Sequence, residues 1–195
     1  MNTNPYNASL AVEKKDDLIG RDGEVESIEK FLQESASPST AKHFAFVGDP
    51  TLGKTSYLNV VEDCINSNHS EKLLPVKCDL TSKSGRKLED VLIKLIQELI
   101  DSAVLQGDDY LLNAKNFFDS TFSTGTTPPD YTIDKYPFYS PIIYNQIKDS
   151  DLSKYQMLIS KMKDAFINDI KKLFELSEKF ISLKAVFLID NIQTL

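Results

Sequence analysis

The sequence predicts an α/β fold, in which a doubly wound and mostly parallel sheet is flanked by helices. Three observations lead to this prediction. Strand-like apolar runs alternate with amphipathic helical patterns along the 195 residues. The stretch GDPTLGKTS, residues 48–56, lies directly between an apolar run and a helical pattern. A final run, AVFLID, is apolar up to its last residue, Asp190, as in strands buried in a parallel sheet.

The composition is that of a globular protein, with 41% apolar and 10% aromatic residues. The chain has 22 Lys and Arg against 29 Asp and Glu, which gives a net charge of −7. This charge does not indicate that the chain as a whole wraps nucleic acid, although it leaves room for a local basic patch. No apolar run approaches the ~18 residues of a membrane span, and Cys64 and Cys78 fit small buried side chains in a reducing compartment. We therefore expect a soluble, cytoplasmic protein with no membrane partner.

The first half of the chain contains two predicted helices and two predicted strands. Residues 1–16 are polar, and we expect a flexible segment there. Apolar residues at helical spacing predict a helix that begins at Asp22, and the turn formers of SASPST link it to a strand over 43–47. A helix from Lys54 to about 66 and a strand over LLPVKCD, residues 73–79, follow, with Pro75 favouring an edge or a bend.

The second half begins with the clearest amphipathic helix, from Leu88. Residues 104–150 contain glycine, four prolines and many aromatics, which predicts an insertion with a short helix near 109–118. Its aromatics suit either a partner-binding surface or a loop packed onto its own domain. A long helix over 152–182 leads to the last strand. Since three strands are few for a parallel sheet, we expect the rest of the sheet and a lid to follow Leu195.

Residues 48–56 match the phosphate-binding pattern G-x-x-x-x-G-K-[ST]. Two glycines let the backbone bend into a nest of inward N–H groups, and the following helix N-terminus adds partial positive charge. Lys54 would reach the β and γ phosphates, and Thr55 would supply a hydroxyl ligand to Mg²⁺. The predicted phosphate-binding residues are Gly48, Asp49, Pro50, Thr51, Leu52, Gly53, Lys54, Thr55 and Ser56.

Asp190 is the second predicted metal ligand, because a carboxylate at the end of an apolar strand is where such sites hold Mg²⁺. The next residue, Asn191, can orient an attacking water but cannot accept its proton. We therefore expect Asp190 and Asn191 to be the catalytic pair of a slow hydrolysis. His43 and His69 have no companions at metal-ligand spacing, so zinc is not expected.

Taken together, LIGRDGEVESIEKFL, FVGDPTLGKTS and VFLIDN resemble the AAA+ and STAND groups of ATPases, over residues 17–103 and 150–195. The chain is similar to origin-recognition-like and NACHT-like bacterial ATPases. The resemblance implies that residues 17–195 are the N-terminal part of a nucleotide-binding domain, and that an element of four residues lies against the adenine ring. Those residues are Leu18, Ile19, Gly20 and Arg21. The chain departs from the family pattern in three ways. Asn191 stands in place of an acid, the spacing from Lys54 to Asp190 is long, and a sensor residue and an arginine finger are lacking.

The resemblance implies an ATP- and Mg²⁺-binding regulatory protein whose nucleotide state controls self-assembly or signalling, with bacterial antiviral defence as one setting. It implies a homo-oligomer or larger assembly, and hydrolysis by the full-length protein, whereas this segment alone would be slow or inactive. One alternative is a DNA-associated initiator or transposition ATPase, nuclear if it is a eukaryotic initiator, although this segment does not itself indicate DNA binding. Another alternative is a non-hydrolysing, nucleotide-bound scaffold. ATP and GTP are not distinguished.

Overall fold

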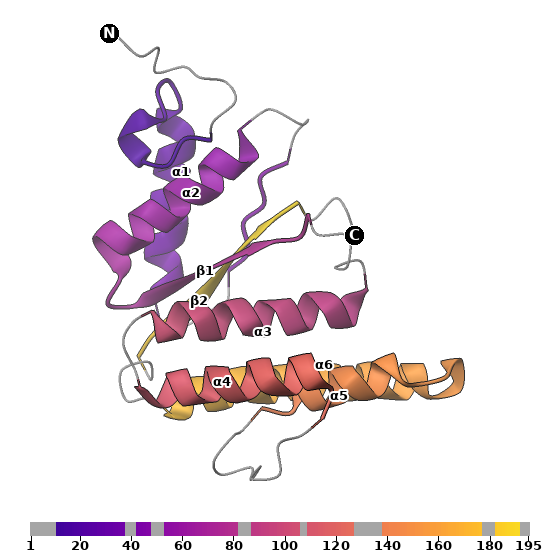
Figure 1. Cartoon of the computed structure of the whole chain (residues 1–195). Helices are drawn as coiled ribbons and strands as arrows, with labels where there is room; N and C mark the ends of the chain where they lie inside the picture. The colour runs from indigo at the N-terminus through magenta and orange to yellow at the C-terminus, as the bar shows by residue number, and fades with distance from the viewer. Residues whose placement is uncertain are drawn as a thin grey trace, which may run out of the picture. The chain divides into compact units, whose positions relative to one another are not determined.

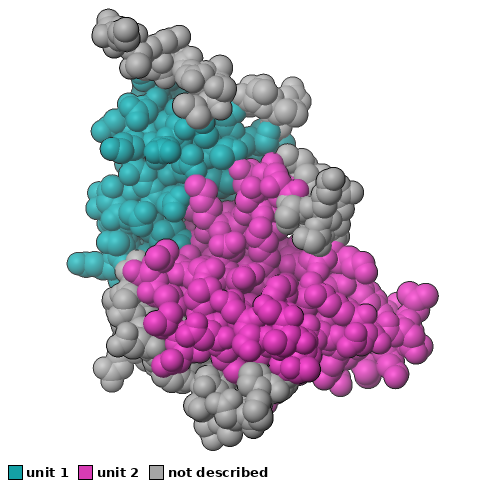
Figure 2. All heavy atoms as spheres, in the orientation of Figure 1, with its two compact units in different colours: residues 1–75 teal, residues 76–195 magenta. Residues whose placement is uncertain are grey.

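The computed structural model describes residues 11–37, 42–47, 53–81, 87–105, 109–126, 138–176 and 182–191. The chain divides into two compact units, unit 1 with residues 1–75 and unit 2 with residues 76–195 (Figure 2). The described part is mostly helical, with one pair of parallel strands flanked by helices (Figure 1). In that part, no helix is both long enough and apolar enough to cross a bilayer.

Unit 1 is built around two helices, α1 (Asp22–Ser35) and α2 (Lys54–Cys64). α1 begins at the predicted residue and buries Val25, Ile28 and Leu32, so its helical period is confirmed. A short 3-10 helix, η1 (Lys15–Asp17), precedes α1. α2 continues into a π-helical turn, η2 (Ile65–His69), so helical backbone extends slightly past the predicted end at 66.

The strand that we predicted over residues 43–47 is not formed. Residues 42–47 have no regular secondary structure, and Val47 is 94% exposed. Strand backbone needs a neighbour to accept and donate its hydrogen bonds. The apolar side chains here are instead used for ring contacts: Phe44 lies against Phe31, and Phe46 stacks on Tyr57. The prediction of a strand over this apolar run is therefore wrong.

The two other predicted strands are present as β1 (Leu73–Asp79) and β2 (Lys184–Asp190), which pair in parallel. The division between the two units falls within β1, after Pro75. β2 was expected to be buried throughout, but only Leu188 is fully buried. Because β1 is its only paired strand in the described part, β2 lacks the cover that a central strand receives on both sides.

Unit 2 contains the helices α3 (Leu88–Val104), α4 (Asp109–Thr124), α5 (Ser140–Lys148) and α6 (Leu152–Leu176). α3 begins at the predicted residue. α6 follows the predicted long helix to Leu176, and its expected continuation over 177–181 lies outside the described residues. In Figure 1, α3 runs beside the strand pair, and α4 and α6 lie beyond it. Side chains from α3 and α6, including Leu95 and Phe166, pack with Cys78 and Leu80 next to the strands.

The predicted insertion over 104–150 is more helical than expected. α4 runs to Thr124 rather than to about 118, and α5 is an additional helix with Pro141 in its first turn, where proline is tolerated. Phe118 and Phe138 are both 1% exposed and meet edge to face. These aromatics therefore serve the core of unit 2, as in the reading of a segment packed onto its own domain.

A buried carboxylate joins α5 to α6. Asp169 of α6 is 1% exposed, and its two oxygens accept hydrogen bonds from the backbone N–H groups of Tyr139, at 3.0 Å, and Ser140, at 2.7 Å. The residue preceding α5, Tyr139, makes no side-chain cap, so Asp169 caps the helix from a distant part of the chain. Burial raises the pKa of Asp169 to about 6, against the lowering effect of hydrogen bonds from Ser140 and Tyr139.

Replacing this cap should destabilise unit 2. We expect Asp169→Ala to lower the free energy of unfolding by roughly 2–4 kcal/mol, because two buried N–H groups lose their acceptor. Urea denaturation of the variant measures this loss. Asp164→Ala, an exposed position on the same helix, is the matched control and should change stability by less than ~0.5 kcal/mol. Equal midpoints for the two variants would show that the cap contributes nothing.

The raised pKa also predicts a pH dependence. Between the ordinary value of 3.8 and about 6, folded Asp169 holds a proton that the unfolded chain releases. Its contribution to stability is therefore full below about pH 4 and is lost as the pH rises through 6, by about 3 kcal/mol at most. Asp169→Asn cannot ionise, so it should not show this loss. As the pH rises from 4 to 7, the free energy of unfolding of wild type should therefore fall relative to that of Asp169→Asn, as measured by urea denaturation. A constant difference over that range would contradict this prediction.

Candidate functional site

The predicted base-contact element forms the turn between η1 and α1. Leu18 is half-buried and Ile19 is 66% exposed. Gly20 has a φ of +74°, a backbone conformation that side chains other than glycine rarely adopt. Arg21 follows as the residue that precedes α1. The glycine thus allows the reversal of the chain that brings Arg21 to the start of α1.

The phosphate-binding motif is described only at its C-terminal end. Gly48, Asp49, Pro50, Thr51 and Leu52 lie outside the described residues. Gly53 has a φ of +77° and stands at the N-cap of α2, where it offers no capping side chain. Lys54 and Thr55 begin α2, as predicted, and the first turn of this helix contains no acidic residue.

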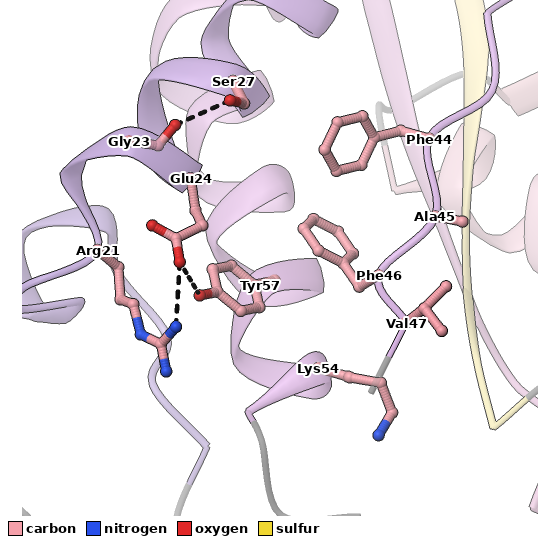
Figure 3. Close-up of a pocket in the computed structure, with 10 residues that line it drawn as sticks. All are labelled: Arg21, Gly23, Glu24, Ser27, Phe44, Ala45, Phe46, Val47, Lys54 and Tyr57. Atoms are coloured by element: carbon pink, nitrogen blue, oxygen red, sulfur yellow. Dashed lines mark hydrogen bonds and ion pairs between the residues drawn. The ribbon is translucent and has the colours of Figure 1, made fainter. Parts of the chain in front are cut away.

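A cleft of about 510 Å³ lies in unit 1, beside the starts of α1 and α2 (Figure 3). It brings Arg21 and Lys54, which are far apart in sequence, into the lining of one hollow. The segment 44–47 lines the opposite side, with its rings turned toward the helices (Figure 3). The lining residues are Arg21, Gly23, Glu24, Ser27, Phe44, Ala45, Phe46, Val47, Lys54 and Tyr57.

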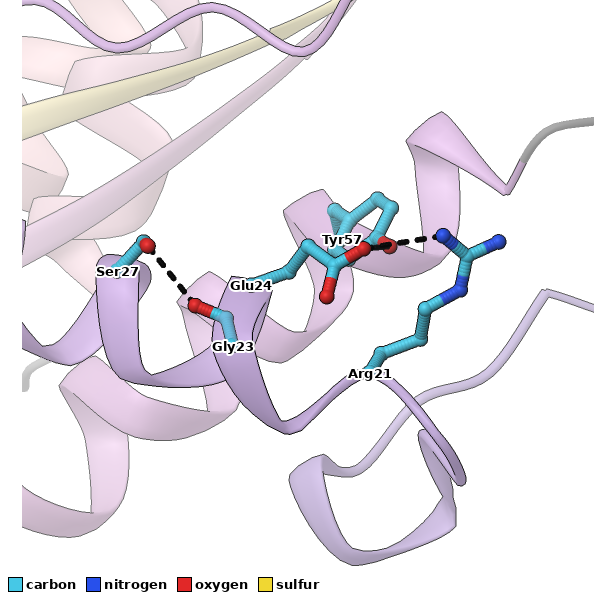
Figure 4. Close-up of polar contacts among 5 residues, drawn as sticks. All are labelled: Arg21, Gly23, Glu24, Ser27 and Tyr57. Atoms are coloured by element: carbon cyan, nitrogen blue, oxygen red, sulfur yellow. Dashed lines mark hydrogen bonds and ion pairs between the residues drawn. The ribbon is translucent and has the colours of Figure 1, made fainter.

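One wall of the cleft is polar. Arg21 Nη1 donates to Glu24 Oε1 at 3.0 Å, and the Tyr57 hydroxyl donates to the same oxygen at 3.4 Å (Figure 4). The hydrogen bond from Arg21 holds the pKa of Glu24 below its ordinary value. The carboxylate therefore stays ionised at neutral pH and links α1 to α2 through Tyr57.

The other wall is aromatic. Phe46 and Tyr57 are stacked with ring centroids 4.9 Å apart and an interplanar angle of 7°. Phe44 meets Phe46 edge to face at 4.9 Å and is itself 46% exposed. Such rings offer a flat apolar surface to a planar ligand. The sequence reading did not assign Phe44, Phe46 or Tyr57 to the site, although their positions directly beside the phosphate motif could have suggested it.

Ser56 serves the fold of unit 1 through a contact that the sequence did not reveal. Its side chain is 7% exposed, and its hydroxyl oxygen accepts a hydrogen bond of 2.9 Å from the backbone N–H of Val12. We expected Ser56 to contact phosphate. That contact stays a prediction, and the hydroxyl oxygen also holds the segment that precedes η1.

Asp190 and Asn191 belong to unit 2, at the carboxyl end of β2. Asn191 has a φ of +60°, and its side-chain amide donates to Asp79 Oδ1 at 2.8 Å. Asp79 ends the neighbouring strand β1, and Thr81 also donates to its carboxylate, through both N–H and hydroxyl. Burial raises the pKa of Asp79, but these hydrogen bonds outweigh it and hold the pKa below its ordinary value. The carboxyl ends of the paired strands thus carry two acids and one amide.

Asp79 is the residue of this group that the sequence reading missed. A signal was present, since the predicted strand LLPVKCD ends in aspartate, as AVFLID does. In the described part of the chain, no three side chains of His, Cys, Asp or Glu gather to hold a metal ion.

Cys64 and Cys78 are both buried, and burial raises the pKa of Cys78 to about 11, as expected for a thiol that serves packing.

Of the predicted residues, Arg21 and Lys54 line the cleft in unit 1, whereas Asp190 and Asn191 belong to unit 2 and are not among its lining residues. In comparisons with protein-family models, curated proteins and solved structures, the chain matches none of them.

The left-handed backbone of Asn191 predicts a particular order of stabilities. Both Asn191→Ala and Asn191→Gly remove the hydrogen bond to Asp79, but only alanine adds strain at a positive φ. We expect Asn191→Ala to unfold at a lower urea concentration than Asn191→Gly, with a difference of about 1 kcal/mol. If the glycine variant were the less stable of the two, this backbone conformation would not be the one populated in solution.

Proposed function

We propose that this protein is an ATP-binding regulatory ATPase of the AAA+/STAND type, with a doubly wound P-loop sheet of which β1 and β2 are a part. The observation that carries the proposal is the cleft in unit 1, where Arg21 of the LIGR element and Lys54 of the phosphate motif line the same hollow. Two motifs chosen from the sequence for one ligand thus contribute to one cleft.

A triphosphate suits the residues at the start of α2. The helix N-terminus carries partial positive charge, Lys54 adds a full one, and no acidic residue in the first turn opposes them. Gly53 holds a left-handed turn that lets the backbone enter the helix directly after the predicted phosphate nest. These features favour a polyanion at this end of the cleft.

A nucleobase suits the aromatic side of the cleft. Phe44 and Phe46 offer ring surface, and Arg21, held by Glu24, offers a guanidinium that can stack on or donate to a heterocycle. The polar side chains of the lining, Arg21, Glu24, Ser27, Lys54 and Tyr57, do not separate adenine from guanine. ATP is proposed over GTP because of the resemblance of the LIGR element to the adenine-contacting element of the family.

Thr55 and Asp190 are the proposed ligands of Mg²⁺. Hydroxyl and carboxylate oxygens are the hard donors that this ion prefers, and Mg²⁺ would neutralise charge on the phosphates. Asn191 presents an amide that can orient water but cannot remove a proton from it. We therefore propose slow hydrolysis and a regulatory role in which the bound nucleotide controls self-assembly, in the cytoplasm.

A non-hydrolysing scaffold is the second candidate. The hydrogen bond between Asn191 and Asp79 favours it, because the amide at the position of an expected acid is already engaged by a neighbouring carboxylate. Under this alternative, bound nucleotide stabilises the fold and is not turned over. Binding is common to both candidates, whereas turnover and nucleotide-dependent assembly belong to the first.

Lys54→Ala tests the proposal. Loss of the ammonium should weaken Mg·ATP binding at least about tenfold, since a hydrogen bond to a charged group is removed. Titration of a fluorescent ATP analogue measures affinity, and light scattering with ATP measures assembly. Lys30→Ala, an exposed lysine of α1 outside the cleft, is the control and should bind as wild type does. Unchanged binding by Lys54→Ala would refute a P-loop site, and retained assembly with lost binding would favour the scaffold.

A further inference from the structure

A segment directly before the LIGR element is fastened along α2. We call residues 11–17 the strap. The backbone N–H of Val12 donates to Ser56 Oγ at 2.9 Å, and the Asn59 side-chain amide donates to the carbonyl oxygen of the same Val12, also at 2.9 Å. Both backbone hydrogen-bonding groups of Val12 are thus satisfied by side chains of one helix.

A third contact continues this line. The backbone N–H of Lys15 donates to Asp63 Oδ2 at 3.1 Å. Ser56, Asn59 and Asp63 are spaced three and four residues apart, so they lie along one face of α2, in successive turns. The Lys15 ammonium also pairs with Glu29 of α1, which ties the strap to both helices of unit 1. Residues 11–16 belong to the segment that we expected to be flexible. They run along α2 and are held there by hydrogen bonds to Ser56, Asn59 and Asp63.

The strap ends where the predicted base contact begins. η1 closes it, with the N–H of Leu18 donating to the carbonyl of Lys15 at 3.1 Å. The turn from Leu18 to Arg21 is thus held at one end by the strap and at the other by α1. Because α2 also carries Lys54 at its start, one helix is connected both to the phosphate motif and, through the strap, to the LIGR turn.

We infer that Asn59 and Asp63 are positioning residues for nucleotide binding, which act by fastening the strap to α2 and so holding the LIGR turn at the cleft. This inference rests on the proposed nucleotide site. Neither residue lines the cleft, so each acts through the backbone of Val12 or Lys15 and not on the ligand. The part of the ligand that depends on them is the base, since the phosphate end is served by α2 itself.

The experiment compares two probes on the same variants of the full chain. Asn59→Ala and Asp63→Ala should each weaken Mg·ATP binding about fivefold, the effect expected for the loss of one ordering hydrogen bond. Both variants should bind inorganic tripolyphosphate as wild type does, measured by displacement of a fluorescent ATP analogue. Asp63→Asn keeps a carbonyl acceptor for the Lys15 N–H and should restore ATP affinity. Asn66→Ala, an exposed asparagine of η2, is the matched control.

The outcomes distinguish failure of the proposed nucleotide binding from failure of the positioning role of Asn59 and Asp63. If wild type binds neither probe, the proposed function is wrong. If wild type binds Mg·ATP and both alanine variants bind it equally well, the proposed function stands and the positioning role is refuted. If the variants lose ATP and tripolyphosphate to the same extent, or if Asp63→Asn is as weak as Asp63→Ala, the contacts support the fold alone and the positioning role is again refuted.

Discussion

The parallel pairing of β1 with β2 is the constraint on which unit 2 depends. Parallel strands place their carboxyl ends at the same edge and need a long crossover between them. Here the crossover contains α3 to α6, which pack on one another, and side chains of α3 and α6 pack against the strands. The shared edge is also what brings Asp79 to Asn191. A single pairing therefore accounts for both the helical bulk of this unit and the polar group at the strand ends.

In unit 1, contacts between side chains hold charged residues around the cleft. Arg21 is paired with Glu24, and Tyr57 joins that pair to α2, so the polar wall is held by contacts between two helices. The stacked rings of Phe46 and Tyr57 bring the segment 42–47 against the same helix without any strand pairing. Tyr57 takes part in both walls, and the two surfaces of the cleft are consequently coupled through one side chain.

Features that depend on neighbouring residues were predictable, and those that depend on distant ones were not. The start of α3 at Leu88 follows from its own helical period, and Gly53 and Lys54 follow from a local motif. The strand over 43–47 failed because an apolar run specifies burial, while a strand also requires a partner. Asp169 caps a helix that begins 29 residues earlier in the chain, and Asn191 meets a carboxylate 112 residues away. No local pattern encodes these two contacts, which both lie in unit 2.

The residues proposed for nucleotide binding and those proposed for hydrolysis belong to different units. Under the proposed function, the residues that would contact base and phosphates, Arg21 and Lys54, belong to unit 1, and the residues that would act on the γ-phosphate or water belong to unit 2. Under that proposal, contacts within unit 1 are enough to support nucleotide binding. Asn191 offers an amide that is held by Asp79 and cannot accept a proton from water, so the same proposal expects slow turnover. Under the proposed function, slow turnover would let the bound nucleotide act as a signal of occupancy, which fits the regulatory role proposed above.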